Sequence, residues 1–271
     1  MSEKIYDPVF ATEPAVLDAF ADFVAIVRQL RRDCPWDREQ THTSVKHLFI
    51  EETYEVVEAI DNQNWEELKK ELGDVLLHVV FHSAIAEGEQ EFALADVIET
   101  ESAKLVRRHP HVFGDTAVSG VEEVLANWER IKLTEGRNKR GVLAGVPAEL
   151  PGLLRAYRMQ EKAAAVGFDF ATAEAAWVKV EEELGEFKKT VEGDLPADEQ
   201  EGELGDLLFA LVNYARLAGF QPENALRRTN AKFARRVQYI EQKLDAEGKT
   251  MAGMDLETLD RYWDEAKAAG L

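Results

Sequence analysis

The stretch that decides the fold spans residues 45–81 and reads VKHLFIEETYEVVEAIDNQNWEELKKELGDVLLHVVF. Apolar residues recur in it at the three- and four-residue spacing of amphipathic helices, as at Leu68, Leu72 and Val75. The polar run DNQN at residues 61–64 separates two such patterns and is typical of a turn. The stretch therefore predicts two antiparallel helices joined by a short loop.

Helical periodicity extends along most of the chain. Similar patterns begin at Leu17, Val180 and Leu204, and no run of alternating β-branched residues is bounded by turn residues. The apolar fraction of 45% is high enough for a buried core, which argues against a disordered chain. The sequence therefore predicts an all-α protein.

Glycine and proline mark one strong interruption of this pattern, at residues 134–152. The segment holds four glycines and two prolines, a density that indicates a linker between domains. We therefore predict an N-terminal domain over residues 1–134, a linker over 135–152 and a C-terminal domain over 153–271. A second stretch, residues 33–44, is also predicted to be irregular, and it has no counterpart in the second half.

The two halves are copies of one another. Four blocks match in the same order, namely 51–55 with 182–186, 71–77 with 203–209, 103–108 with 231–236, and 128–132 with 263–267. Matches in a constant order indicate a duplicated domain.

The matched blocks contain paired acids three residues apart, a spacing that places both acids on one helix face. In the first half these acids are Glu52, Glu55, Glu71 and Asp74. Their midpoint falls within the predicted turn, so an antiparallel hairpin sets both pairs at the same level. The second half repeats this arrangement with Glu183, Glu186, Glu203 and Asp206.

Four converging carboxylates repel one another unless a cation lies among them. Ligands that are all oxygen favour hard cations such as Mg²⁺ or Mn²⁺. Gly73 and Gly205 interrupt these helices at some cost in stability, and we expect them to mark a close approach of helices. One copy alone is better explained as a solvated acidic face, but two copies with matching turns favour two metal sites.

Basic residues follow each acidic hairpin. Lys104 and Arg108 are four residues apart, as are Lys232 and Arg236. Cations on one helix face near a metal would suit a polyphosphate, although an exposed face of internal salt bridges explains the spacing equally well. Trp263 could stack on a nucleobase, but a lone tryptophan more often belongs to a core.

Composition excludes other classes of protein. The chain has 32 basic and 52 acidic residues, and a net charge of −20 repels a nucleic-acid backbone. No apolar run is long enough to span a membrane, and the first residues lack the pattern of a signal peptide. Cys34 is the only cysteine, which fits a reducing compartment. We expect a cytoplasmic protein without membrane or nucleic-acid partners.

The acidic blocks together resemble the MazG nucleotide pyrophosphohydrolases. The sequences CPWD at 34–37, RRHPHVF at 107–113 and VGFD at 166–169 are similar to marks of the two-domain bacterial members. The resemblance implies two MazG-like domains with four-helix cores that dimerise. It also implies Mg²⁺-dependent hydrolysis of nucleoside triphosphates between the α and β phosphates, to a monophosphate and pyrophosphate, in cleansing or control of nucleotide pools.

The resemblance also implies roles for single residues. In the second half, the metal ligands and catalytic acids would be Glu183, Glu186, Glu203 and Asp206. The residues that hold the nucleotide there would be Lys179, Glu182, Lys232, Arg236 and Trp263. In the first half, the ligands would be Glu52, Glu55, Glu71 and Asp74, with Lys104 and Arg108 as the basic pair. The position that matches Lys179 is Leu48, so we expect the second half to carry most turnover.

Two questions stay open at the level of sequence. Spacing does not identify the carboxylate that accepts the proton of the attacking water. A different class of protein also fits the acidic patches, namely a metal-responsive helical module that docks a basic partner without catalysis.

Overall fold

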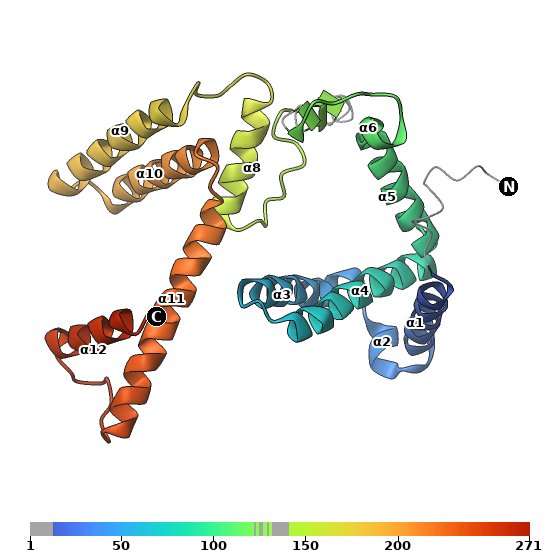
Figure 1. Cartoon of the computed structure of the whole chain (residues 1–271), viewed down its shortest axis with the longest axis horizontal. Coiled ribbons are helices and arrows are strands. Elements are labelled where there is room, and N and C mark those ends of the chain that lie inside the picture. Colours follow the sequence, from blue (N-terminus) through green and yellow to red (C-terminus); the bar gives the residue numbers. More distant parts are fainter. Residues whose placement is uncertain (1–12, 122, 125–126, 129, 132–140) are drawn as a thin grey trace. The chain divides into compact units, whose positions relative to one another are not determined.

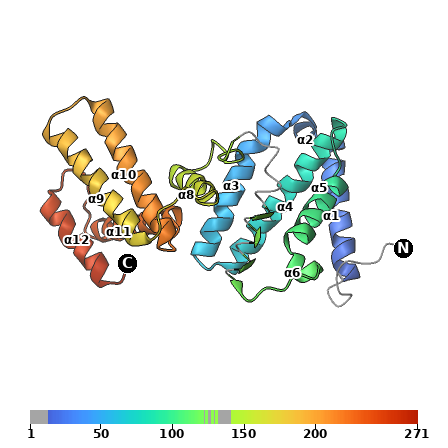
Figure 2. The same cartoon turned by 90° about the horizontal axis from the view of Figure 1, so that it is seen from above.

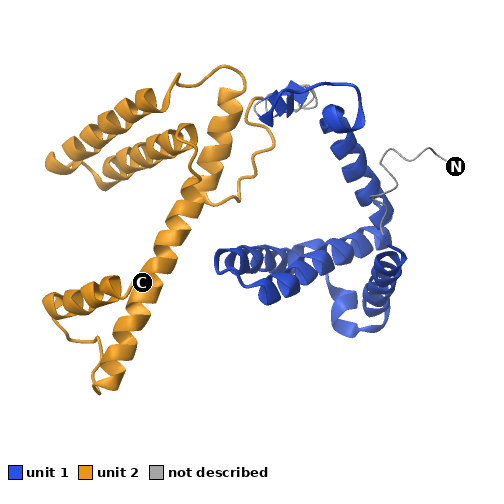
Figure 3. Ribbon diagram, in the orientation of Figure 1, with its two compact units in different colours: residues 1–134 blue, residues 135–271 orange. Residues whose placement is uncertain are grey.

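The computed structural model describes residues 13–121, 123–124, 127–128, 130–131 and 141–271 (Figure 1). Every regular element in these ranges is a helix, so the prediction of an all-α fold is confirmed. The chain divides into two compact units, residues 1–134 and 135–271, which are coloured separately in Figure 3. Within the predicted linker, residues 135–140 lie outside the described residues, and 141–151 form turns before the next helix begins.

Unit 1 is built around one long central helix, α4. Its helices are α1 (Pro14–Asp33), α2 (Pro35–Glu39), α3 (His42–Asp61), α4 (Trp65–Gly88), α5 (Leu94–Arg108) and α6 (Pro110–Phe113). Helices α1, α3 and α5 all pack against α4 (Figure 2). The core between them is apolar and consists of Val27, Val45, Val80, Phe81 and Ile85.

The stretch 33–44 is more regular than its sequence predicts. It contains the short helix α2, which begins at Pro35, and α3 already begins at His42. Proline suits the first position of a helix because its missing N–H would have no partner there. Thr41 caps α3, since its side chain accepts a hydrogen bond from the Ser44 backbone N–H. The prediction of an irregular stretch was therefore wrong.

The predicted hairpin of α3 and α4 is confirmed. Helix α3 ends at Asp61 and α4 begins at Trp65, so the loop falls where the polar run predicts it. Gln63 takes the left-handed backbone conformation with φ of 52°, which reverses the chain direction. The Asn64 side chain accepts a hydrogen bond from the backbone N–H of Glu67 and caps α4.

Unit 2 repeats the hairpin. Its helices are α8 (Gly152–Ala164), α9 (Ala173–Glu192), α10 (Ala197–Leu217), α11 (Pro222–Ala246) and α12 (Leu256–Ala268). Helices α9 and α10 form the hairpin, and Asp194 has φ of 50° in the turn between them. Helix α8 packs against α10 and α11, whereas α12 packs against α11.

The expectation of a close helix approach at Gly73 and Gly205 was wrong within a single chain. A Cβ atom placed at either glycine meets nothing within 4 Å among the described residues outside its own helix backbone. Both glycines lie on exposed faces of α4 and α10. The hairpins of one chain therefore do not account for these residues.

None of the helices that the structure describes combines the length and the apolar character needed to cross a membrane.

Candidate functional site

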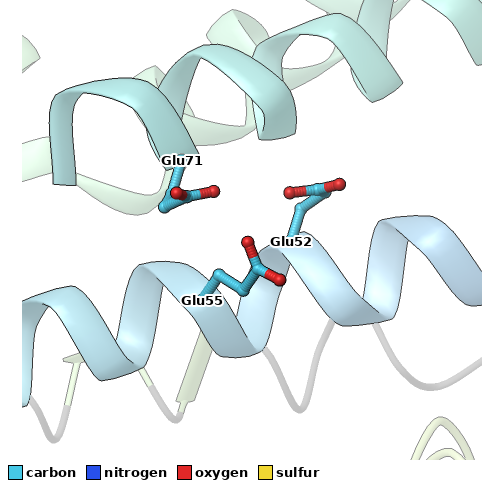
Figure 4. Close-up of side chains that lie close together, drawn as sticks. All are labelled: Glu52, Glu55 and Glu71. Atoms are coloured by element: carbon cyan, nitrogen blue, oxygen red, sulfur yellow. The ribbon is translucent and has the colours of Figure 1, made fainter. Parts of the chain in front are cut away.

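The acidic pairs of unit 1 meet between α3 and α4. Figure 4 shows the carboxylates of Glu52 and Glu55, both from α3, turned toward that of Glu71 from α4. One carboxylate oxygen from each of the three lies within 4.8 Å of the other two. Asp74 is outside this group of three, although its charge still acts on Glu52. The hairpin therefore brings together three of the four predicted ligands of unit 1.

Repulsion and burial shape the electrostatics of this cluster. Glu71 is only 5% exposed, and burial, with hydrogen bonds to Glu67 and Glu55, raises its pKa to about 7. Burial also raises the pKa of Glu52, and the charges of Asp74 and Glu55 add to the effect. Carboxylates with raised pKa values gain from a nearby positive charge, because it stabilises their ionised form.

Unit 2 assembles an equivalent cluster between α9 and α10. Ligand atoms of Glu183, Glu203 and Asp206 lie within 4.8 Å of one another. The fourth predicted ligand, Glu186, lies outside this group, but its charge still raises the pKa of Glu203 after the larger effect of burial. Both units thus contain the first and third acids of the pattern and differ in which further acid joins them.

A lysine lies directly beside the unit 2 cluster. The Lys179 ammonium group is 2.6 Å from a carboxylate oxygen of Glu183 and 2.9 Å from one of Glu182. These two acids raise the pKa of Lys179, so it stays charged. In unit 1, the matching residue Leu48 packs against the hydrophobic core. A lysine at this position beside the acids is therefore present in unit 2 and replaced by leucine in unit 1.

The donor atoms in both clusters are carboxylate oxygens, which suits a hard divalent cation. In unit 1 burial raises the pKa values of Glu52 and Glu71, and neighbouring acids add to the effect. In unit 2 Lys179 compensates part of that charge. The residues of both clusters therefore fit a divalent metal ion.

A pocket of about 690 Å³ lies beside the unit 2 cluster. Helices α8, α9 and α10 and the segment before α9 enclose it, and Lys179, Glu183 and Asp206 form part of its wall. Much of the remaining wall is apolar and includes Phe168 and Phe209. An apolar pocket with a few charged groups on one side can hold a molecule that is part ring system and part anion.

The pocket also contains polar groups that the sequence did not single out. Gln160 donates a hydrogen bond from its amide nitrogen to the Phe209 carbonyl oxygen, 2.9 Å away. Its other amide atom, Oε1, is buried and has no hydrogen-bond partner among the residues that the structure describes. Arg216 donates to the side chain of Asn213 and forms an ion pair with Asp169. In the sequence, the motif VGFD at residues 166–169 was the feature that pointed to a functional role for this region.

The basic and aromatic residues predicted for unit 2 gather on α11 and α12. The guanidinium group of Arg236 lies over the Trp263 ring, 5.0 Å from its centre, and its Nε donates to the Leu271 carbonyl oxygen. Lys232 lies exposed on α11. None of these three residues lines the pocket beside the acids. Within one chain, Lys232, Arg236 and Trp263 are therefore not part of the pocket beside the acids.

The remaining predicted residues lie on exposed or half-buried helix faces. Lys104 forms an ion pair with Glu101, one turn earlier on α5. Arg108 ends α5 as the last residue before His109. Glu182 is exposed and contacts Lys179.

Comparison with known proteins relates both clusters to one family. Two parts of the chain, residues 40–113 and 171–240, match the family model described as MazG nucleotide pyrophosphohydrolase domain. These ranges contain both acidic clusters, Lys104, Arg108, Lys179, Lys232 and Arg236. Trp263 lies beyond them.

Several curated proteins resemble the chain along most of its length. The nucleoside triphosphate pyrophosphohydrolase/pyrophosphatase MazG of Thermotoga maritima is 43% identical over 251 residues, covering 92% of this chain and 95% of that protein. The nucleoside triphosphate pyrophosphohydrolase of Escherichia coli K12 is 40% identical over 254 residues, covering 93% and 97%. The uncharacterized protein YabN of Bacillus subtilis is 46% identical over 268 residues, covering 97% and 55%.

Proposed function

Because this chain belongs to the MazG nucleotide pyrophosphohydrolase family, we propose that its acidic clusters bind Mg²⁺, which Mn²⁺ can replace, for the hydrolysis of nucleoside triphosphates. The enzyme is a nucleoside triphosphate pyrophosphohydrolase that cleaves between the α and β phosphates, and its products are a monophosphate and pyrophosphate. The observation that carries the ion assignment is the convergence of Glu183, Glu203 and Asp206, all oxygen donors, beside a pocket.

We assign different roles in the reaction to the four acids of unit 2. Glu183, Glu203 and Asp206 would hold the ion, which supplies charge neutralisation at the phosphates and lowers the pKa of the attacking water. Glu186 lies outside that group of three. It is close enough to Glu203 for its charge to raise the pKa of Glu203. We therefore assign Glu186 to accept the proton of the attacking water.

Lys179 is placed to hold a phosphate oxygen. Its ammonium group already borders the acids and the pocket, so a triphosphate bound there exchanges part of its contact with Glu182 for phosphate. The nucleoside would occupy the apolar part of the pocket, against Phe168 and Phe209.

We also propose a homodimer. Large apolar side chains along one face of α10 are exposed in one chain, namely Leu204, Leu208 and Leu211. Contiguous exposed apolar surface of this kind indicates an interface. Assembly would cover this surface and the exposed Gly205, and it would bring Lys232, Arg236 and Trp263 to a substrate that they do not reach in one chain.

The dimer is tested by sedimentation velocity on the full-length protein across the micromolar range. A species of twice the chain mass, with activity that falls on dilution below the dissociation constant, is expected. A monomer that keeps full activity at every concentration contradicts the proposal. Leu208→Glu, on the exposed α10 face, should shift the equilibrium toward monomer, whereas Glu199→Gln at the start of α10 should not.

Product analysis tests the reaction. The purified enzyme is incubated with each common ribo- and deoxyribonucleoside triphosphate and Mg²⁺, and products are separated by ion-exchange chromatography with ³¹P NMR. Monophosphate and pyrophosphate in equal amounts are expected. A diphosphate with inorganic phosphate would contradict cleavage between the α and β phosphates, and Glu183→Gln controls for contaminating phosphatases.

The ion itself needs a separate measurement. Titration calorimetry with Mg²⁺ and Mn²⁺ on metal-free protein should show two sites per chain, of which a Glu183→Gln, Asp206→Asn variant loses one and keeps the site of unit 1. Unchanged binding in that variant would place the ion elsewhere.

A further inference from the structure

Unit 1 contains a second group of potential metal ligands, formed by histidines rather than acids. His42 is the first residue of α3, and His78 and His82 lie one turn apart on α4. The rings of His78 and His82 contact Phe49, and the ring of His42 stacks on that of His82, near the end of the hairpin that is opposite to its turn. Glu52, Glu55 and Glu71 lie nearer the turn, although Asp74, one helical turn before His78, acts electrostatically on His78.

His42 and His82 face each other through corresponding nitrogens. Their Nδ1 atoms are 2.8 Å apart, and their rings are parallel within 4° with centres 5.1 Å apart. The two nitrogens therefore point toward each other across the gap between the helices. Without a metal ion, such a pair shares one proton in a hydrogen bond, and each nitrogen presents a lone pair or a proton to the other.

A carboxylate lies behind His42. The Oε2 atom of Glu89, the residue after α4, is 3.9 Å from the Nε2 atom of His42. Metal-binding histidines commonly turn their second ring nitrogen toward a carboxylate, which fixes the tautomer and makes the first nitrogen a better ligand. Glu89 is placed to do this for a metal ion on the Nδ1 side of His42.

His78 supplies an independent observation. Its side chain is more than nine-tenths buried, and its Nδ1 atom has no hydrogen-bond partner in the described structure. Its ring centre is 6.1 Å from that of His82. A buried polar atom without a partner is costly. As placed, the nitrogens of His78 do not join those of His42 and His82 within 4.8 Å, so His78 gains an ion at the pair as its partner only when its side chain turns.

Access and protonation both suit metal binding. The His42 side chain is 41% exposed, so an ion can reach the pair from solvent. Burial lowers the pKa of His82, with the charges of His42 and His78 adding to the effect, which favours the neutral ring. Neutral imidazole is the form that binds metals.

We propose that His42 and His82, with Glu89 orienting His42, bind a transition-metal ion of the Zn²⁺ class in unit 1, and that the His78 side chain turns to become the third ligand. Imidazole nitrogen prefers Zn²⁺, Co²⁺, Ni²⁺ and Cu²⁺ over Mg²⁺, so this site selects a different ion from the acidic clusters. A bound ion links the first turn of α3 to α4 and holds the hairpin together at its open end.

Unit 2 lacks these histidines. The number of Zn²⁺ ions bound per chain therefore distinguishes the histidine site from the acidic clusters. In the duplicated pattern, the positions of His42, His78 and His82 correspond to Ala173, Ala210 and Tyr214. The acidic clusters, in contrast, occur in both units. An ion at the histidines must therefore bind once per chain, whereas ions at the acids can bind twice.

The experiment titrates Zn²⁺ into full-length, metal-free protein in the presence of a saturating excess of Mg²⁺. Isothermal titration calorimetry gives affinity and stoichiometry, and Co²⁺ substitution gives a ligand-field absorption spectrum. The variants are His42→Ala, whose side chain is half exposed, and His82→Ala. His47→Ala is the matched control, because His47 is an exposed histidine on the same helix and outside the group.

We expect one equivalent of Zn²⁺ per chain and a Co²⁺ spectrum typical of nitrogen ligands. His42→Ala and His82→Ala should each weaken Zn²⁺ binding by about tenfold or more, and His47→Ala should leave it unchanged. Zn²⁺ should also raise the melting temperature of the wild type but not that of His42→Ala, because an ion that binds the folded state stabilises it.

Three results would overturn the proposal. The first is the absence of Zn²⁺ binding in excess Mg²⁺. The second is an affinity that is unchanged in both His42→Ala and His82→Ala. The third is loss of the Zn²⁺ equivalent in a Glu52→Gln, Glu183→Gln variant, which would assign the ion to the acids. Circular dichroism of each variant confirms that its helices are intact.

Discussion

The two hairpins of this enzyme share a scaffold and differ in what surrounds their acids. Each brings three carboxylates together between two antiparallel helices. In unit 2 the acids border Lys179 and a pocket, whereas in unit 1 the matching Leu48 belongs to the core. The duplication thus kept three grouped carboxylates in both copies, and the lysine and the pocket that we propose to hold a triphosphate lie beside the second group.

The difference also concerns charge. Lys179 neutralises part of the acidic group in unit 2, while the unit 1 acids raise one another's pKa values with no lysine at the corresponding position. We infer that unit 1 depends more on a metal ion for the stability of its ionised acids. Four experiments test this comparison, beginning with the largest expected effect.

Removal of divalent cations should abolish turnover altogether. Carboxylates that face a polyphosphate repel it unless a cation lies between them, in either unit. Initial rates are measured after exhaustive chelation and again after Mg²⁺ is restored. Activity that persists undiminished in the chelated enzyme would mean that neither cluster acts through a metal ion.

Loss of single acids should separate the two units. Glu183→Ala or Asp206→Ala should lower kcat/KM by on the order of 100-fold or more, since even residues that only support metal ligands cost 10- to 100-fold. Glu52→Ala or Asp74→Ala should leave a substantial fraction of activity.

The control for these variants is their assembly and helical content, measured by sedimentation and circular dichroism. Initial rates with several triphosphates give the ranking. If the unit 1 variants lose as much activity as those in unit 2, the two sites are equivalent in turnover and the asymmetry proposed here is wrong.

Lys179→Leu makes unit 2 resemble unit 1 at this position and should have an intermediate effect. Loss of one charged hydrogen bond to phosphate should raise KM by about tenfold, with a smaller change in kcat. Lys188→Leu serves as the matched control, because Lys188 is exposed on the same helix and outside the pocket. Equal effects of the two substitutions on KM would show that the net charge of α9, and not a specific contact of Lys179, determines substrate binding.

The smallest effect concerns stability against pH in metal-free protein. In the folded chain Glu71 keeps its proton up to about pH 7, whereas its ordinary pKa is 4.5. Between these values the unfolded state binds fewer protons than the folded state, so stability falls as pH rises through this window. The melting temperature should therefore decline from about pH 5 to pH 7.5 in a chelator, and Mg²⁺ should reverse the decline.

Glu71→Gln isolates this contribution, because the amide cannot ionise. It should flatten the decline of melting temperature with pH, and Glu58→Gln, on the exposed face of α3, should not. Glu52 and Glu203, whose pKa values burial also raises, account for a decline that remains in Glu71→Gln. A slope unaffected by Glu71→Gln would show that Glu71 ionises normally in the folded chain.

Much of the site could be predicted because it depends on local periodicity. Acids three residues apart share a helix face, and a turn midway between two pairs sets them at the same level. These relations place Glu52 opposite Glu71 and Glu183 opposite Glu203, as the structure shows. Periodicity does not specify side-chain rotamers, so it could not show that Glu186 and Asp74 lie outside the groups of three.

Gly73 and Gly205 show a limit of the same reasoning. A glycine within a helix costs stability, so it suggests a local structural requirement. The sequence does not show whether that requirement is a packing contact within the chain or one with another chain. The structure leaves both glycines exposed, and a sequence cannot report which helix faces remain uncovered.

The sequence by itself determined the all-helical fold, the duplication, the two hairpins and the acids that line them, because each follows from spacing along one or two adjacent helices. Only the tertiary structure decided the pocket, where Gln160 on α8 meets Phe209 on α10, and the histidine group, where His42 meets His82. These pairs are 49 and 40 residues apart. Contacts at such separations depend on how helices pack and on which rotamers their side chains adopt, and neither is encoded in a local repeat.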